Sequence, residues 1–267
     1  MLVVKTIKNY SNLVNMNKID FQKLKNEIYD LNQNLTDIEA EKIVEIQYDT
    51  NNQNTTREIL NWYEDLRNNL ESTIELIDLE TCDQWKTSNK QNVEHESGNF
   101  FKIMGVRTRN SSSREVGNQG WDQPIIIEKD FDGGLLGLVR SYINGTPHYL
   151  VEAKFEPGNF NLLQLSPTLQ ATFSNLNKAH GGKEPNFTNY FLDHEESNDL
   201  YLFNQWLSED GGRLFNKRNK GLVKNINYED IGDIPKNFIW VSLYQIREFI
   251  NEHTIVNPHL ARLIFLF

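Results

Sequence analysis

Three ionisable residues alternate along one short segment of the chain. Glu152, Lys154 and Glu156 occupy alternate positions in the second half of YLVEAKFE, a segment that is typical of a β-strand. Side chains of a strand alternate between its two faces, so all three are expected on one side. A lysine between two carboxylates can work as an acid or a base if it is partly buried, because desolvation and the neighbouring charges then set its pKa.

The residues that follow are polar but carry little charge. From Asn159 through Asn177 the chain has no lysine or glutamate, and Gln, Ser and Thr take their places. Hydroxyl and amide groups suit directional hydrogen bonds to a polar ligand, whereas solvent-facing strands usually carry long charged side chains. Gly181-Gly182, directly after His180, suggests backbone placed close to another group. We interpret this polar face as the wall of a binding site, with a plain solvent-exposed face as the alternative.

A hairpin must position these residues. Asn144-Gly145 predicts a tight turn before the first strand. Pro157-Gly158 predicts a type II turn before the return strand NLLQLS. Tyr149, Val151, Ala153 and Phe155 should share the apolar face. The polar face should hold His148, Glu152, Lys154, Glu156, Gln164 and Ser166. The segment 167–176 fits either a helix or a strand.

Helices are predicted on both sides of this hairpin. Residues from about 18 to 80 show helical spacing of apolar residues, with Thr55 or Thr56 as a cap. Ser242 and Gln245 have the spacing of a capping box, and Pro258 is expected in the first turn of a last helix. Strands are predicted near residues 98 and 125, and YLFNQWLS fits a helix or a strand. The fold class is therefore α+β, with a mixed, antiparallel-rich sheet.

Composition excludes some classes of protein. The chain has 267 residues and a formal net charge of −10. Nucleic-acid-binding proteins carry a concentrated basic face, which makes that class a poor fit. Cys82 is the single cysteine, so the chain cannot form an internal disulfide, as is typical of a reducing compartment. No apolar window is long enough to span a membrane, and we expect a soluble, cytoplasmic protein.

A metal site is not indicated. His194, Glu195 and Glu196 are adjacent, but adjacent side chains on a helix or strand point apart. No second cluster has the spacing of metal ligands.

Several segments match one known family in order. WDQPI, GLLGLV, HYLVEAKFEPGN, LQLSPTLQATFSN and HGG resemble the sugar-nucleotide 2,3-dehydratases (NDP-hexose 2,3-dehydratases) of deoxysugar biosynthesis. FIWVSLYQIREF and IVNPHLARLI resemble that family's closing elements. The resemblance covers roughly residues 85–267. Glu152 departs from the family's pattern, in which Gln is usual.

The resemblance implies a Nudix-like fold used for a different reaction. The G-x5-E-x7-R-E-x-x-E-E-x-G box that holds Mg²⁺ in Nudix hydrolases is missing, and Arg114 to Val116 is only a fragment of it. The implied domains are an N-terminal helical segment, 1–84, and a Nudix-like dehydratase module, 85–267. Family members typically carry two such modules, so the resemblance implies a homodimer of this chain.

The implied reaction removes water from a nucleoside-diphospho-4-keto-6-deoxyhexose, with thymidine diphosphate as the expected nucleotide. A base takes the C3 proton next to the C4 ketone, and the C2 hydroxyl leaves as water. The enol tautomerises to a 3,4-diketo-2,6-dideoxy sugar, which a partner ketoreductase would consume. The resemblance implies neither a redox cofactor nor a metal, because hydrogen-bond donors can stabilise the enolate.

The reaction requires a base, an acid, a donor to the C4 oxygen and a diphosphate clamp. The resemblance and the polar face together favour Lys154, Glu156 and His180 as catalytic residues, with His148 and Tyr190 in reserve. Arg107 and Arg109 are candidates for the diphosphate, and Trp121 is a candidate for stacking on the nucleobase. Further candidates for sugar and nucleotide contacts are Gln123, Gln164, Ser166, Thr168, Gln170, Thr172, Ser174 and Asn175.

One alternative belongs to a different functional class. The chain could be a non-catalytic sugar-nucleotide-binding module that partners another chain. Both hypotheses predict nucleotide binding, but only a dehydratase removes water. A Nudix hydrolase is disfavoured by the missing box.

Overall fold

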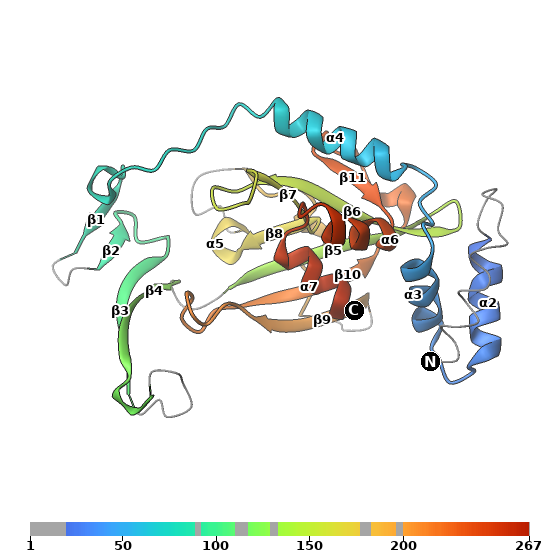
Figure 1. Ribbon diagram of the computed structural model, residues 1–267, viewed down its shortest axis with the longest axis horizontal. Coiled ribbons are helices and arrows are strands. Elements are labelled where there is room, and N and C mark those ends of the chain that lie inside the picture. The colour runs from blue at the N-terminus through green and yellow to red at the C-terminus, as the bar shows by residue number, and fades with distance from the viewer. Residues whose placement is uncertain are drawn as a thin grey trace. The chain divides into compact units, whose positions relative to one another are not determined.

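The computed structural model describes residues 20–88, 92–109, 117–128, 133–176, 183–195 and 200–266 (Figure 1). Helices and antiparallel sheets both occur, which confirms the predicted α+β class in that coarse form. Within the described ranges no helix combines the length and the apolar character needed to cross a membrane.

The chain clusters into two compact units, each built from separate segments. The first unit consists of Met1–Leu70, Val139–Ser166 and Asn225–Phe265. The second consists of Glu71–Leu138, Pro167–Lys224 and Leu266–Phe267. Strand β5 (Gly134–Ile143) contributes residues to both units. The domain boundary expected at 84/85 remains a prediction.

The first unit begins with three helices, α2 (Phe21–Leu31), α3 (Asp37–Gln47) and α4 (Thr56–Asn68). A capping box opens α4: the Thr55 side chain accepts from the Glu58 N–H, and the Glu58 side chain bonds back to the Thr55 backbone. Thr55 rather than Thr56 is therefore the cap. The helical prediction extended too far, because no helix follows Asn68 until the short 3-10 turn Leu79–Thr81. Ile74, Leu76 and Ile77 are exposed in this segment, so no packed apolar face stabilises a helix there.

The sheet of the first unit is built around β6 (Thr146–Phe155). The first half of β6 pairs with β5. Asn144-Gly145 joins the two strands, and its φ values of 50° and 81° are those of a two-residue hairpin turn. β7 (Leu163–Ser166) pairs with its second half, and β11 (Phe238–Val241) pairs along the other edge. Glu152 therefore lies between Ser166 of β7 and Phe238 of β11, and Lys154 lies opposite Gln164.

The connection from β6 to β7 is not the predicted type II turn. Gly158 lacks the positive φ that this turn requires at its third residue. Positive φ values occur later instead, at Asn161 (61°) and Leu162 (70°). The Asn159 N–H donates to the Glu156 carbonyl at 3.0 Å, and its side-chain amide donates to the Lys154 carbonyl at 3.0 Å. These bonds close a longer loop, so the return strand starts only at Leu163.

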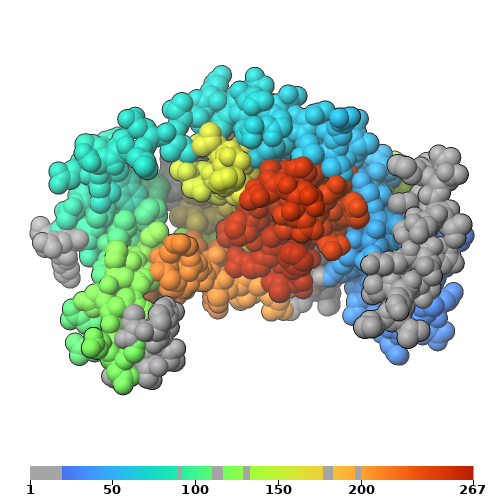
Figure 2. Space-filling model, viewed as in Figure 1, coloured from blue at the N-terminus to red at the C-terminus, as the bar shows by residue number. Residues whose placement is uncertain are grey.

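Two helices complete the first unit, α6 (Leu243–Glu252) and α7 (Pro258–Leu266). The capping box of Ser242 and Gln245 and the position of Pro258 are as predicted. Helix α6 packs beside α3, and the red atoms of the C-terminal helices lie on the visible face in Figure 2. In the apolar tail, Leu263 and Ile264 are buried, whereas Phe265 and Leu266 are exposed.

The second unit holds two sets of strands. β1 (Trp85–Thr87), β2 (Val93–His95), β3 (Lys102–Thr108) and β4 (Trp121–Ile127) form an antiparallel sheet in that order. β8 (Leu169–Thr172) pairs with the first residues of β5, and β9 (Tyr201–Ser208) pairs with β10 (Arg218–Asn225). The undecided segment 167–176 is thus strand β8 followed by the single helical turn α5 (Phe173–Leu176), and YLFNQWLS is a strand.

Gly137 on β5 has no room for a side chain. A Cβ at this position would lie 2.6 Å from the ring of Phe191, which is fully buried. We expect Gly137→Ala to lower the free energy of unfolding by about 1–3 kcal/mol, because overpacking displaces neighbouring side chains. Urea denaturation would measure this loss. Gly105→Ala on β3 is the control, since a Cβ there meets no heavy atom within 4 Å. Equal losses in both variants would contradict the prediction.

Candidate active site

The ionisable residues near the end of β6 form a linked pair. Nζ of Lys154 lies 3.4 Å from Oε2 of Glu152. The lysine side chain is 25% exposed and the glutamate side chain 16% exposed. Alternation along the strand places both side chains on one face. The acid–base pattern of the sequence is therefore present as a partly buried ion pair.

Asn237 contacts the other oxygen of this glutamate. Its Nδ2 donates to Oε1 of Glu152 at 3.1 Å. Its backbone is fixed as well, because the Asn237 carbonyl accepts from the Ala153 N–H at 2.8 Å. The two carboxylate oxygens of Glu152 thus have different partners, an ammonium group and a neutral amide.

The surroundings of Glu152 change its acidity. Burial raises the pKa of its carboxyl, and the charge of Glu156 acts in the same direction. Lys154 and the hydrogen bond from Asn237 oppose this rise. A carboxyl whose pKa lies nearer neutrality can both accept and return a proton during a reaction.

Two residues of β7 continue this surface. In the register of the sheet, Gln164 lies opposite Lys154 and Ser166 lies opposite Glu152. Gln164 is 8% exposed and Ser166 is fully buried. The Ser166 hydroxyl donates to the Glu152 carbonyl at 3.4 Å. We call Glu152, Lys154, Gln164 and Ser166 the polar strip. Its ammonium and amide groups are suitable donors for the oxygens of a sugar or a ketone.

Glu156 lies beyond the end of β6, in the loop to β7. Its N–H donates to the Leu162 carbonyl at 3.4 Å. The negative charge of Glu156 raises the pKa of Glu152. Lys154 forms an ion pair with Glu152. The structure thus places Glu156 on a loop and Glu152 within the sheet.

His148 joins β6 to the loop before α4. It is fully buried, and Nδ1 lies 2.9 Å from the Thr146 carbonyl. Because the Thr146 carbonyl can only accept, Nδ1 carries a proton. Nε2 lies 3.2 Å from both the Asn52 N–H nitrogen and Oδ1 of Asn51. Burial lowers the pKa of this imidazole. His148 thus links β6 to the loop before α4, and its burial favours the neutral imidazole.

The predicted hydroxyl and amide residues of the second unit lie on β8, on α5 and, for Thr168, directly before β8. Thr168 is 1% exposed, and Gln170 pairs with Leu136 of β5. The hydroxyls of Thr172 and Ser174 lie 2.8 Å apart. The Asn175 N–H donates to the Thr172 hydroxyl at 3.3 Å. In this structure Thr172 therefore fixes the first turn of α5.

The predicted diphosphate and nucleobase residues lie on β3 and β4. Arg107 binds Asp122 with two hydrogen bonds, of 2.8 and 2.6 Å, and Arg109 directly follows β3. Trp121 donates to the Gln123 side chain at 2.8 Å, and Gln123 donates to the Gly212 carbonyl at 2.7 Å. A phosphate group at Arg107 would compete with the carboxylate that now occupies its guanidinium fork.

The remaining sequence candidates are His180 and Tyr190. His180 falls in 177–182, outside the described residues. The Tyr190 carbonyl accepts from Nζ of Lys224 at 3.0 Å, and its ring stacks on Phe187. Among the described residues no cluster of three His, Cys, Asp or Glu side chains could hold a metal ion. Glu196 of the sequence trio also lies outside this part of the chain.

A comparison of the sequence with profiles of known protein families shows to which family the chain belongs. The profile of the NDP-hexose 2,3-dehydratases matches residues 56–266. This chain belongs to that family. The match starts with α4 and extends through α7, so it includes the polar strip and Asn237.

Three curated relatives of this dehydratase-family chain share one name, dTDP-4-dehydro-6-deoxy-alpha-D-glucopyranose 2,3-dehydratase. The protein from Saccharopolyspora spinosa is 35% identical over 182 residues, which is 68% of this chain and 36% of its own length. The protein from Streptomyces violaceoruber is 37% identical over 167 residues, 62% of this chain and 35% of its own. The protein from Amycolatopsis orientalis is 33% identical over 207 residues, 76% of this chain and 42% of its own. The chain thus spans well under half the length of these relatives.

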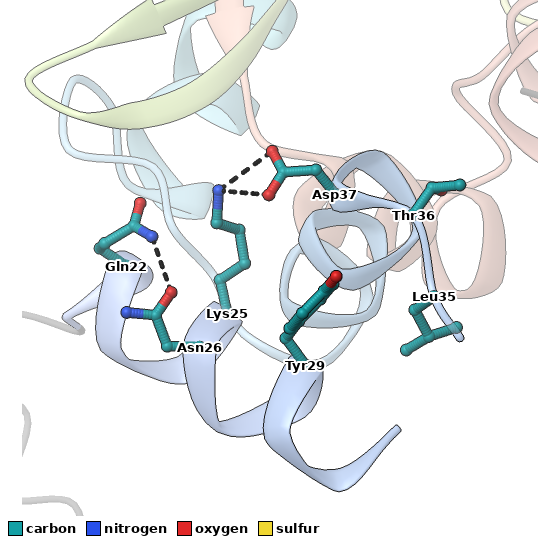
Figure 3. Close-up of a pocket in the computed structure, with 7 residues that line it drawn as sticks. All are labelled: Gln22, Lys25, Asn26, Tyr29, Leu35, Thr36 and Asp37. Atoms are coloured by element: carbon teal, nitrogen blue, oxygen red, sulfur yellow. Dashed lines mark hydrogen bonds and ion pairs between the residues drawn. The ribbon is translucent and has the colours of Figure 1, made fainter. Parts of the chain in front are cut away.

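A surface pocket of this dehydratase-family chain lies between α2 and α3 (Figure 3). Its volume is about 270 Å³, and its lining residues are Gln22, Lys25, Asn26, Tyr29, Leu35, Thr36 and Asp37. Nζ of Lys25 lies 3.0 Å from Asp37 and 3.3 Å from Glu41. Two carboxylates thus balance the lysine, and the pocket contains no residue of the polar strip.

Two residues of the candidate site in this dehydratase-family chain are not among the candidates named from the sequence. Glu152 has a signal in the sequence, its alternation with Lys154, although it departs from the family's pattern. Asn237 carried no local signal. It is 85 positions from Glu152, and only the pairing of β11 with β6 brings it there.

Proposed function

We propose that this chain eliminates water across C2–C3 of a thymidine-diphospho-linked 4-keto-6-deoxyhexose, to give a 3,4-diketo-2,6-dideoxy sugar in deoxysugar biosynthesis. Membership of the 2,3-dehydratase family supports the reaction, and the names of the relatives support the substrate class. The observation that carries the proposal is the partly buried pair of Glu152 and Lys154 beside Gln164.

The polar strip fits the electronic demands of this reaction. Loss of the C3 proton places negative charge on the C4 oxygen, and the Lys154 ammonium can donate to that oxygen. The enolate then expels the C2 hydroxyl, which leaves as water once it receives a proton. The sugar thus loses one hydrogen from C3 and one hydroxyl from C2, and no electrons are exchanged with a cofactor. Glu156 and His180 remain candidates for acid and base from the sequence.

Other parts of the proposal concern the fold and the partners. We propose a Nudix-like fold, a homodimer in which two copies work together, a cytoplasmic location and a partner ketoreductase. Light scattering would measure the mass in solution. An active monomer would refute the homodimer.

The function is tested by incubating the protein with thymidine-diphospho-4-keto-6-deoxyglucose. We expect the wild type to produce a nucleotide sugar that has lost one water, measured by mass spectrometry after the adjacent ketones are trapped with an aromatic diamine. A protein-free incubation is the control. Binding of the sugar nucleotide, measured by calorimetry, without loss of water would instead support the non-catalytic binding module.

A further inference from the structure

We infer that Arg218 and Lys220 of β10 bind the diphosphate group of a nucleotide, and that Trp206 of β9 is a positioning residue that holds both cations. We call these three residues the basic cluster. The inference rests on the proposed function for the identity of the ligand, and it deepens that function by assigning the phosphate contacts. It places the diphosphate at cations that no carboxylate occupies, unlike Arg107, whose guanidinium binds Asp122.

The pairing of β9 with β10 brings the basic cluster to one face of the two strands (Figure 1). Trp206 lies opposite Lys220, and Arg218 is two positions before Lys220 on the same strand. Alternate residues of a strand share a face. The ring centre of Trp206 lies 4.2 Å from Cζ of Arg218 and 5.4 Å from Nζ of Lys220. Both cations therefore contact one indole ring.

The two cations of the cluster have no acidic partner. In the part of the chain that the structure describes, neither Arg218 nor Lys220 forms an ion pair. The nearest lysines on either side in the sequence differ, because Lys217 binds Glu128 and Lys224 binds Asp193. An indole attracts a cation through its π-electrons and does not neutralise it. The N–H donors of both side chains thus stay available to an anion.

The cluster is accessible from solvent. Trp206 is 37% exposed, Arg218 is exposed and Lys220 is half-buried. The chain has a formal net charge of −10, so most of its cations have carboxylates to pair with. Two unpaired cations on one exposed face therefore form a local site for a negatively charged ligand.

The backbone that carries the two cations is fixed by its neighbours. Asn219, the residue between them, is 6% exposed, and its side chain donates to Glu209 at 2.6 Å. Gly133 packs so closely on β10 that a Cβ there would lie 1.8 Å from the Arg218 carbonyl oxygen. Groups that are already held in place lose less conformational entropy when a ligand binds. The cluster is therefore preorganised.

Charge and spacing favour a diphosphate as the ligand. A guanidinium can donate two parallel hydrogen bonds to phosphate oxygens, and an ammonium binds phosphate as a point charge. Alternate residues of a strand lie about 7 Å apart, so Arg218 and Lys220 can each contact one of two linked phosphoryl groups. A carboxylate carries a single charge and would leave one of the cations unpaired.

Calorimetric titration with thymidine diphosphate, inorganic pyrophosphate and thymidine tests the site. We expect Arg218→Met and Lys220→Met each to weaken binding of the first two ligands by about 10–100-fold, because each variant loses hydrogen bonds between charged groups. Thymidine has no phosphate, so its binding should be the same in wild type and variants. Arg213→Met is the matched control, because Arg213 is an exposed arginine of the same unit whose Nη1 lies 2.7 Å from Asp210. Thermal unfolding would establish that all variants are folded.

Trp206→Leu tests the positioning role. This change keeps both charges but removes the π-electrons that hold them, so we expect thymidine diphosphate to bind about 2–5-fold more weakly. Trp206→Phe should restore most of the affinity, because a phenyl ring also attracts cations. An affinity that is unchanged in Trp206→Leu, or equally low in Trp206→Phe, would overturn the positioning role.

The outcomes separate the basic cluster from the function on which it rests. Unchanged affinity for thymidine diphosphate in Arg218→Met and Lys220→Met would overturn the site, as would an equal loss in Arg213→Met. Binding of pyrophosphate without binding of thymidine diphosphate would overturn the assignment to a nucleotide. A wild type that binds thymidine diphosphate through the cluster, yet removes no water from the 4-keto sugar nucleotide, would overturn the proposed function while the site stands.

Discussion

Replacing Arg140 with methionine is expected to lower the free energy of unfolding by about 3–5 kcal/mol, the typical effect of breaking a buried ion pair. Arg140 of β5 is fully buried, and its Nη2 lies 2.7 Å from Glu41 and 2.8 Å from Glu45 of α3. Glu45 is also fully buried. Without the guanidinium, its carboxylate loses the cation that it contacts and cannot regain water.

The loss of stability should depend on pH. Burial raises the pKa of the Glu45 carboxyl, while Arg140 and the Tyr149 hydroxyl lower it. Without Arg140 this pKa rises further, so the folded variant holds the proton to a higher pH than the unfolded chain does. Folding takes up a proton between these two pKa values, and the variant loses stability as the pH rises through that window. The deficit relative to wild type should therefore be larger at neutral pH than in mild acid.

Urea denaturation followed by circular dichroism would measure the effect of Arg140→Met. The matched control is the triple variant Glu41→Gln, Glu45→Gln and Arg140→Met, which removes the carboxylates together with the cation. We expect it to recover much of the lost stability, since neutral replacement of a whole buried ion network is often tolerated. A triple variant as unstable as Arg140→Met would show that packing, rather than the unpaired charge, causes the loss.

Replacing Lys154 with methionine should slow water loss by a factor on the order of 10²–10³, while the affinity for the sugar nucleotide changes far less. In the proposed mechanism, the ammonium group would interact most strongly with the oxygen that becomes negative in the transition state. The ground-state ketone carries much less charge. Trapped product would report the rate, and calorimetry would report binding.

Lys25→Met is the matched control for Lys154→Met. Lys25 is a partly buried lysine of the same unit, 13% exposed, and it is paired with Asp37 (Figure 3) and with Glu41. Loss of its ion pairs should affect stability without affecting turnover. Similar losses of turnover in both variants would mean that the effect at Lys154 is structural. Weaker binding with an unchanged rate in Lys154→Met would limit its role to substrate binding.

Local features of this protein were determined by the sequence itself. The capping boxes at Thr55 and Ser242 and the Asn144-Gly145 turn depend on residues no more than three positions apart. Alternation placed Glu152 and Lys154 on one face for the same reason, because a strand has a fixed period of two. Such interactions form wherever the chain adopts the local geometry, so short segments of sequence are enough to predict them.

The tertiary structure decided what these local elements contact. Alternation put Glu152 and His148 on the same face, yet Asn237 of the β11 segment meets Glu152, and the loop before α4 covers His148. No local pattern indicates that Arg140 binds Glu41 and Glu45 of α3, which lie 99 and 95 positions away in the sequence. A periodic pattern defines the face of a strand but not the element that packs on it. That choice depends on the register of distant strands and on which buried polar groups can satisfy one another, and both arise only when the whole chain folds.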